Sequence, residues 1–186
     1  MAISGNERIP CDAVVLASAG GALPLISGTG FRAPLTSLTG FTLTLELSDS
    51  EALPALTVAS PEKGFILSRL DRRLRATGRF FLGSPAEKEK KAECNRLYDA
   101  VMGSFENLRS NTVASQFWSG EFLASPDRFP LAGPVPGADN VILNIAHGPF
   151  GLAGAGESAE IAAASALGED PGEFAAFCSP GRFAEK

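Results

Sequence analysis

A strand, a glycine-rich turn and a helix of small residues follow one another near the C-terminal end, and this pattern constrains the fold most. The apolar run Val141–Ile145 is followed by the turn 147–151, and Ala and Ser dominate 155–167. We expect a buried strand and a helix that packs very close to its neighbour. The turn either presents the free N–H groups of the helix N-terminus to an electron-rich group or is a tight turn without a ligand.

The composition indicates a soluble globular protein. The chain has 186 residues, enough for one compact domain, and 45% of them are hydrophobic. The formal net charge of −5 argues against a nucleic-acid surface, which would be basic. No stretch approaches the ~20 consecutive apolar residues of a membrane span, and the polar residues 1–10 do not resemble a signal peptide. We expect neither nucleic acid nor a membrane as a partner.

The cysteines and the single histidine argue against a metal site. Cys11, Cys94 and Cys178 are far apart and form no Cys-x-x-Cys pair, and His147 is the one histidine of the chain. Sparse, unpaired cysteines indicate free thiols in a reducing compartment. We predict no bound metal, and the sequence leaves the compartment otherwise unknown.

A second apolar run, near the N-terminus, has the character of a buried strand. Residues 12–17 read DAVVLA and lead into Gly20 and Gly21, where small residues allow a backbone or a ligand to approach closely. The following segment 31–38 reads as extended, and Pro34 limits it to an edge or a bend.

The middle of the chain reads as antiparallel strands. Phe41–Leu47 alternates apolar and polar residues, which predicts a strand with one packed and one polar face. The segments 64–69 and 72–80 resemble a hairpin that turns at Leu70-Asp71. Its arginine face points either to solvent or to an anion.

One long helix is predicted after these strands. Ser84 is placed at the N-cap, Pro85 at N1 and Glu87 at N3, and Gly103 follows the last helical residue. The charged run 87–91 reads as a solvated face. The predicted apolar face consists of Cys94, Leu97, Tyr98 and Val101.

Three further segments complete the sequence-based assignment. We predict a short strand over 115–120, a turn at Asp139-Asn140 and a loose tail over 171–186. The fold class is α+β with an α/β component: a mixed sheet with one long helix, between pieces of an α/β layer. The expected divisions are 1–30, 31–133, 134–170 and the tail 171–186.

Five stretches in this order resemble the C-terminal half of FAD-dependent D-amino-acid dehydrogenases, within the D-amino-acid oxidase and glycine oxidase superfamily. They are DAVVLASAGG (12–21), PLTSLTGFTLTLEL (34–47), ILSRLDRRLRATG (66–78), FWSGEFLASPDRFPLAG (117–133) and NVILNIAHGPFGLAGAGESAEIAAASAL (140–167). The last stretch resembles the closing strand, "G-H-x-x-x-G" loop and final helix of that family. Together the five cover nearly the whole chain.

The resemblance implies a two-domain FAD oxidoreductase that deaminates its substrate oxidatively. The hydride then passes from the substrate Cα to flavin N5, and the flavin carries the chemistry. On this reading, 1–30 and 134–170 belong to the FAD-binding layer and 31–133 to the substrate domain. If flavin binds, the resemblance assigns its contacts to Gly20, Gly21, His147, Gly148, Gly151 and Leu152.

Two departures from the family pattern bear on catalysis. The 186 residues contain no strand–GxGxxG–helix unit, which would hold the pyrophosphate of FAD. The arginine that binds the substrate carboxylate in the family corresponds to Phe122, and Glu121 precedes it. Arg128 is the nearest replacement, although only after rearrangement. In addition, Pro149 removes one N–H donor from the glycine turn.

Three interpretations remain open. The chain is an accessory or structural subunit that is not catalytic alone, because an accessory subunit needs the surface and not the chemistry. It is alternatively one half of a split FAD-dependent oxidoreductase, completed by a second chain with GxGxxG. A truncated product without activity is the third interpretation. We favour the first, with a protein partner and with FAD bound only if another chain completes the site.

Overall fold

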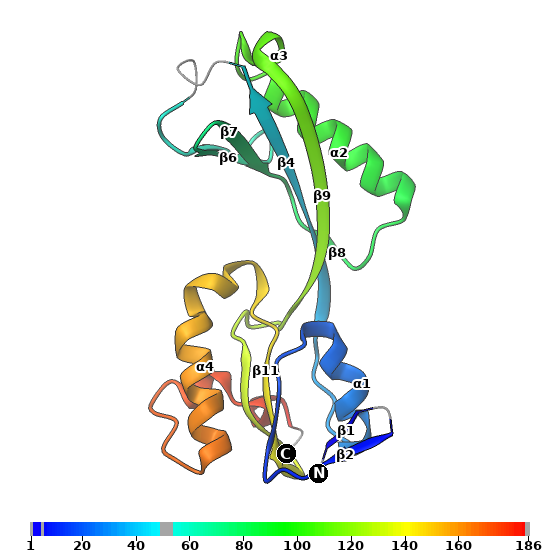
Figure 1. Cartoon of the computed structure of the whole chain (residues 1–186), viewed down its shortest axis with the longest axis vertical. Helices are drawn as coiled ribbons and strands as arrows, with labels where there is room; N and C mark the ends of the chain where they lie inside the picture. The colour runs from blue at the N-terminus through cyan, green and yellow to red at the C-terminus, as the bar shows by residue number, and fades with distance from the viewer. Residues whose placement is uncertain (1, 5, 49–53, 185–186) are drawn as a thin grey trace. The chain divides into compact units, whose positions relative to one another are not determined.

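The computed structural model describes residues 2–4, 6–48 and 54–184 and divides the chain into two compact units. Unit 1 consists of residues 1–37 and 122–186, and unit 2 of residues 38–121 (Figure 1). Unit 2 lies inside the stretch 31–133 that the sequence assigns to a substrate domain. The chain crosses from one unit to the other within two long strands, which is why no turn or linker in the sequence marks the boundary.

Unit 2 contains one sheet with α2 (Glu87–Met102) packed on one of its faces (Figure 1). The strand order is β5-β6-β7-β4-β8, and β9 also pairs with β4. The short helix α3 (Leu108–Asn111) precedes β9. The strands are β4 (Thr36–Leu47), β5 (Val58–Ser60), β6 (Phe65–Leu70), β7 (Arg73–Thr77), β8 (Phe81–Leu82) and β9 (Thr112–Ala124).

The alternating strand is confirmed. Within β4, Phe41, Leu43 and Leu45 are at most 1% exposed and form the core of unit 2 with Leu97 and Val101 of α2. A side chain on every second residue therefore faces the helix, as the period-2 pattern predicts. Because these side chains are large and fully enclosed, unit 2 has a closed hydrophobic core.

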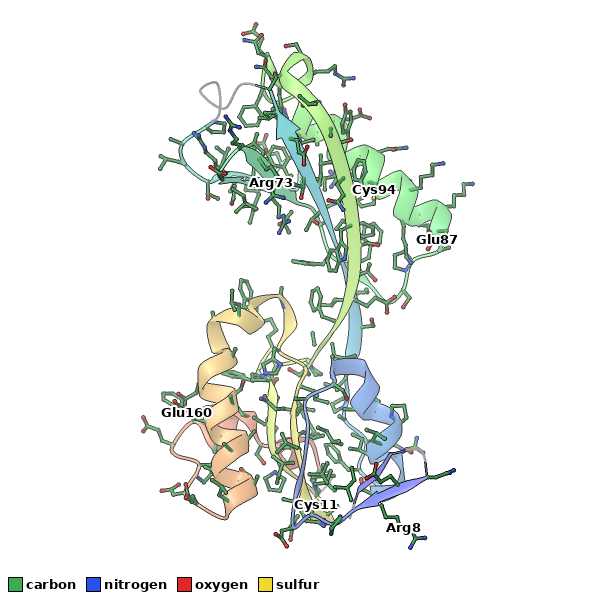
Figure 2. The ribbon with its side chains drawn as sticks, in the orientation of Figure 1. Arg8, Cys11, Arg73, Glu87, Cys94 and Glu160 are labelled. Atoms are coloured by element: carbon green, nitrogen blue, oxygen red, sulfur yellow. The ribbon has the colours of Figure 1, made fainter. Side chains whose placement is uncertain are left out.

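The hairpin is confirmed, with a shifted turn and a shorter second strand. The turn lies at Asp71-Arg72 and not at Leu70-Asp71, because Leu70 still pairs with Arg73 and Asp71 takes the left-handed φ of +56°. The second strand ends at Thr77 and not at Phe80, and the chain pairs with β4 again in β8, where Phe81 lies opposite Thr39. On the arginine face of this hairpin, Arg73 (labelled in Figure 2) and Arg75 are exposed, as both predicted alternatives require.

The long helix is confirmed, but its predicted N-cap is wrong. The N-cap is Ala86, whose N–H donates to the Glu89 carboxylate at 2.8 Å. Ser84 does not cap the helix because its hydroxyl donates to Glu121. In the run expected to be solvated, Lys90 pairs with Glu87 at 2.9 Å.

Glu93 is a buried charge on α2 that the apolar-face pattern does not predict. Its side chain is 3% exposed and lies between Arg79 and Arg96, with shortest distances of 2.9 and 2.6 Å. Burial acts to raise the pKa of Glu93, but the hydrogen bonds from Arg96 and Arg79 hold it below its usual value. Arg96 also donates to the carbonyls of Lys63 and Gly64, which ties α2 to the turn before β6.

Unit 1 is built around a three-stranded sheet in the order β10-β11-β3. The strands are β3 (Val14–Leu16), β10 (Leu131–Val135) and β11 (Ala138–Ile145), and a separate hairpin joins β1 (Ala2–Ser4) to β2 (Glu7–Ile9). The helices are α1 (Ala22–Ile26), α4 (Gly151–Leu167) and α5 (Ala175–Cys178), with short 3-10 turns η1 (Ala19–Gly21), η2 (Ser27–Thr29), η3 (Gly148–Phe150) and η4 (Pro180–Phe183).

The two apolar runs at the ends of the sequence meet in this sheet. β3 and β11 are parallel, with Val14 opposite Val141 and Leu16 opposite Leu143. The strand expected within 12–17 is confirmed as β3, but its expected burial is wrong, because Val14 and Leu16 are only partly buried and Val15 is 45% exposed. The reason is the position of β3, which pairs only with β11 among the described strands and is therefore an edge strand.

Three further expectations for unit 1 need correction. The β10–β11 connection turns at Gly137, with φ +83°, so Asp139 and Asn140 lie inside β11. α4 begins one turn earlier than residue 155. The tail is not loose, because Cys178 is buried and Arg182 pairs with Asp127 at 2.8 Å. A tail ordered by long-range contacts leaves no local pattern.

Candidate functional site

The candidate site is a hollow of about 430 Å³ in unit 1, at the ends of the parallel strands β3 and β11. Ligands of α/β proteins commonly bind outside the carboxyl ends of parallel strands. Its walls are mostly apolar, and among the described residues that line it His147 is the one with an ionisable side chain. The lining residues are Ala17, Ala19, Phe122, Leu123, Asn144, Ile145, Ala146, His147, Gly148, Gly151, Leu152 and Ala155.

His147 joins three parts of this site. Its Nε2 lies 2.9 Å from Asn144 Oδ1 at the end of β11 and 2.9 Å from Ser158 Oγ on α4. The Ser158 hydroxyl itself donates to the carbonyl of Ala155. Because both neighbours of Nε2 then act as acceptors, the network assigns the imidazole proton to Nε2. In this arrangement, His147 ties the middle of α4 to the end of β11.

Burial lowers the pKa of His147. Desolvation disfavours the charged imidazolium, so the ring is neutral at pH 7. A neutral ring with its proton on Nε2 leaves Nδ1 as a hydrogen-bond acceptor. The ring is therefore suited to positioning and to accepting a hydrogen bond rather than to holding an anion.

The geometry of the turn by itself explains why residues 148 and 151 are glycines. Gly148 has φ +61°, a left-handed conformation that favours glycine. A Cβ atom on Gly151 would lie 2.7 Å from the Cβ of His147, closer than side chains approach each other. The turn therefore needs glycine at both positions whether or not a ligand binds.

Two alanines beside the hollow carry backbone strain. Ala19 has φ +49° and Ala146 has φ +61°, and both line the hollow. The left-handed conformation costs an L-residue about 1 to 2 kcal/mol. Strain of this kind is found preferentially at functional sites, so it supports this hollow as the place to look for function.

The sequence-predicted residues separate into two groups. His147, Gly148, Gly151 and Leu152 lie together in the hollow. Gly20 and Gly21 do not line it; they belong to η1, whose first residue, Ala19, does.

Of the two residues discussed for substrate binding, only Phe122 belongs to the hollow. Phe122 lines the hollow, where its side chain is half-buried, whereas Arg128 is exposed and does not line it. Its neighbour Asp127 is instead paired with Arg182, a hydrogen bond that holds the Asp127 pKa at about 2. The structure thus places a phenyl ring, and no arginine, in the wall of the hollow.

Asn144 and Ser158 are site residues that the sequence reasoning missed. Ser158 is 1% exposed in a helix of small residues, and Asn144 interrupts the apolar run 141–145 within β11. A polar residue inside a buried pattern requires a hydrogen-bond partner. Because His147 is the one histidine of the chain, it was a natural partner to consider for both.

The chain belongs to the family described as FAD dependent oxidoreductase (DAO), whose sequence profile matches residues 2–165. It is 28% identical over 185 residues to a D-amino acid dehydrogenase of Xanthobacter autotrophicus, covering 100% of this chain and 44% of the relative. A D-amino acid dehydrogenase of Sinorhizobium medicae is 28% identical over 161 residues, covering 87% of this chain and 38% of the relative. The chain thus spans less than half the length of these relatives.

Solved structures support the same fold. Glycine oxidase from Geobacillus kaustophilus superposes with a TM-score of 0.78 at 19% identity, covering 93% of this chain and 46% of the oxidase. An L-amino acid deaminase from Proteus vulgaris gives 0.70 at 21% identity, covering 92% of this chain and 43% of that protein. These structures show the expected mixed fold. At identities of 19% and 21%, the similarity is evidence for the fold alone. No helix among the described residues is long and apolar enough to cross a membrane.

Proposed function

We propose that this chain is not a catalyst by itself and acts as an accessory part of an assembly, through a protein segment that pairs with β3. The observation that carries the proposal is the position of β3. It is a parallel strand, it pairs only with β11 among the described strands, and Val15 is 45% exposed. Parallel strands are normally covered on both faces. A parallel edge strand with an exposed side chain therefore favours a further protein segment that pairs with it and covers it.

The fit of FAD to the described residues is partial. The start of α4 lines the hollow, and the positive end of its helix dipole suits an electron-rich ring edge, but the Gly151 N–H already donates to the Gly148 carbonyl. The chain offers no GxGxxG loop for the pyrophosphate. We therefore expect the isolated chain to bind FAD weakly, and tight binding to require a second segment that supplies this loop.

The partner proposal is tested by isolating the tagged chain from its native source and identifying co-purifying proteins by mass spectrometry. Val15→Asp places a charge on the exposed residue of β3, and Leu25→Asp is the matched control on α1, where Leu25 is 64% exposed. We expect the same stable partner with the wild type and the control, and its loss with Val15→Asp. No stable partner, or a partner retained by all three proteins, would contradict the proposal.

A split FAD-dependent oxidoreductase is the second candidate. The His147 hollow favours it, because His147, Gly148 and Gly151 match the "G-H-x-x-x-G" loop that this chain resembles and all three line the hollow. In a complex with a GxGxxG partner, this candidate requires a flavin absorbance spectrum and turnover of a D-amino acid with an artificial electron acceptor. Since Phe122 cannot pair with a carboxylate, Phe122→Arg should raise that turnover. A complex without flavin would exclude this candidate and leave the accessory role.

A further inference from the structure

A groove of about 770 Å³ lies within unit 2, between the first half of α2 and the middle of β9 (Figure 1). Its volume falls in the range of roughly 300 to 1,000 Å³ that is usual for small-molecule sites. Lysines of α2 form one wall, and aromatic side chains of β9 form the other. The groove is distinct from the hollow around His147, which belongs to unit 1.

The helix wall is basic, although the chain as a whole has a net charge of −5. Lys88, Lys90 and Lys91 line it beside one carboxylate, Glu87, which is paired with Lys90 at 2.9 Å. Among the described residues, neither Lys88 nor Lys91 forms an ion pair. These two lysines are three residues apart and are therefore like charges side by side on the helix, near the N-terminus, where the helix dipole disfavours cations. An anion bound between them would relieve both costs.

The strand wall presents two aromatic rings that are held in place. Phe117 packs against Tyr98 of α2, with ring centroids 6.3 Å apart, and so ties the strand to the helix one turn beyond the groove. Trp118 is 60% exposed, and its six-membered ring occupies the place of a side chain at position 120, since a Cβ atom on Gly120 would overlap it. Glycine at 120 therefore lets the indole lie along the strand, where its exposed surface can stack on a flat ligand.

We propose that this groove binds a small molecule that joins an aromatic ring to a phosphate group, as a nucleotide does. The ring stacks on Trp118, and the phosphate lies between Lys88 and Lys91. Phosphate suits the two lysines better than a carboxylate does, because it carries a charge of about −1.5 to −2 and three acceptor oxygens. Lysine binds phosphate as a point charge and needs no fixed geometry to do so. The site lies in unit 2 alone and is independent of β3, of the His147 hollow and of the function proposed above.

Titration of the full chain with ADP tests the site, with the fluorescence of Trp118, the single tryptophan, as the readout. Stacking of the adenine ring on the indole should quench it saturably, with a Kd below about 1 mM. Adenosine lacks the phosphates and pyrophosphate lacks the ring, so in competition with ADP each should bind roughly tenfold more weakly or worse. No quenching below about 1 mM ADP, or equal affinity for ADP and either fragment, would overturn the proposal.

A double substitution with a matched control locates the phosphate. Lys88→Gln with Lys91→Gln removes both lysines, and Arg72→Gln with Arg73→Gln removes the same charge from the exposed hairpin of unit 2. We expect the first pair to raise the Kd for ADP roughly tenfold or more and the second to leave it unchanged. Circular dichroism verifies that both proteins are folded. Equal weakening by both pairs would mean attraction by net charge alone, and an unchanged Kd in the first would remove the lysines from the site; either result contradicts the proposal.

Displacing the indole tests the aromatic wall independently of charge. In Gly120→Ala the added methyl group takes the place of the Trp118 ring and leaves every charge of the groove unchanged. Measured by calorimetry, the Kd for ADP should rise toward that for pyrophosphate, while the Kd for pyrophosphate stays the same. Trp118→Leu, measured in the same way, should give the same result. ADP binding that is unaltered in both variants would overturn the stacking and with it the proposal.

Discussion

The two units of this chain differ in how completely each encloses its own sheet. Unit 2 is one continuous segment whose core consists of large side chains such as Phe41, Leu45 and Leu97, all at most 1% exposed. Unit 1 is assembled from two distant segments, and its sheet ends in the parallel edge strand β3. The difference teaches that two compact units of one chain can be built in different ways: the core of unit 2 comes from one continuous segment, whereas unit 1 needs two distant segments and its sheet ends in a parallel edge strand.

The largest expected difference in the free energy of unfolding comes from two matched Leu→Ala substitutions, one in the core of each unit. Leu97→Ala removes a fully buried side chain of unit 2, and we expect a loss of about 3 kcal/mol in the free energy of unfolding. Leu143→Ala does the same in unit 1. Trp118 and Tyr98, the single Trp and Tyr of the chain, both belong to unit 2, so fluorescence follows that unit alone.

Urea denaturation measured by Trp118 fluorescence should therefore shift for Leu97→Ala and remain unchanged for Leu143→Ala. Circular dichroism at the same urea concentrations follows α4 as well and should detect both variants. An equal shift of the Trp118 transition in both would show that the units unfold together, and the comparison would fail.

The next effect comes from the buried carboxylate of unit 2. Glu93→Gln removes the charge that Arg79 and Arg96 share, and we expect a loss of about 2 kcal/mol, because breaking a buried pair leaves its partners uncompensated. Arg96 retains its bonds to the carbonyls of Lys63 and Gly64, which limits the loss. Asp99→Asn is the control, since Asp99 is an exposed carboxylate of α2. Urea midpoints by Trp118 fluorescence measure both, and similar midpoints would contradict a stabilising role for Glu93.

A smaller effect is that the stabilities of the two units depend on pH in different ranges. Burial lowers the pKa of His147 in the folded state, so the unfolded state binds its proton at higher pH. The stabilisation is complete above the unfolded pKa of about 6.5 and is lost as pH falls through it. The pKa of Glu93 is also lowered, because Arg96 and Arg79 favour its charged carboxylate. Unit 2 therefore keeps this stabilisation at pH values above the unfolded pKa of about 4.5.

Between pH 7 and 5.5, circular dichroism of thermal unfolding should show unit 1 weakening while the Trp118 transition stays constant. His147 is the one histidine, so His147→Gln should remove this slope. A slope that persists in His147→Gln would mean that another group is responsible.

The smallest effect concerns backbone strain. Ala19 is exposed and has φ +49°, so Ala19→Gly removes the strain without removing a packed methyl group. We expect a gain of roughly 0.5 kcal/mol, since glycine also gains freedom in the unfolded chain. Asp71→Gly in unit 2 should gain less, because Asp tolerates the left-handed region better. Thermal midpoints by circular dichroism measure both, and a destabilised Ala19→Gly would contradict the strain argument.

Local patterns predicted the elements of unit 2 well. The alternation in 41–47 and the paired segments around Asp71 are enough to specify the hairpin and the packed face of the sheet. Glu93 was missed because its burial depends on Arg79, which is far away in the sequence. The N-cap was misplaced because Ser84 found a better acceptor in Glu121.

The sequence predicted less of unit 1. The strands at both ends were found, and the family resemblance explained why they belong together, but no local pattern shows that β3 lies at an edge. At the candidate site, His147 and the two glycines followed from the turn pattern. Asn144 and Ser158 did not, because their role depends on the packing of α4 against β11, which no local spacing encodes.

Hydrogen exchange of the isolated full chain, resolved by peptide, tests most directly whether unit 1 is unfinished. We predict that amides of β3 exchange orders of magnitude faster than those of β4 and β7, because an edge strand opens locally at small cost while the interior strands β4 and β7 are paired on both sides and exchange only by larger unfolding. Protection of β3 equal to that of β4 would contradict the account, since unit 1 would then be complete without a further protein segment.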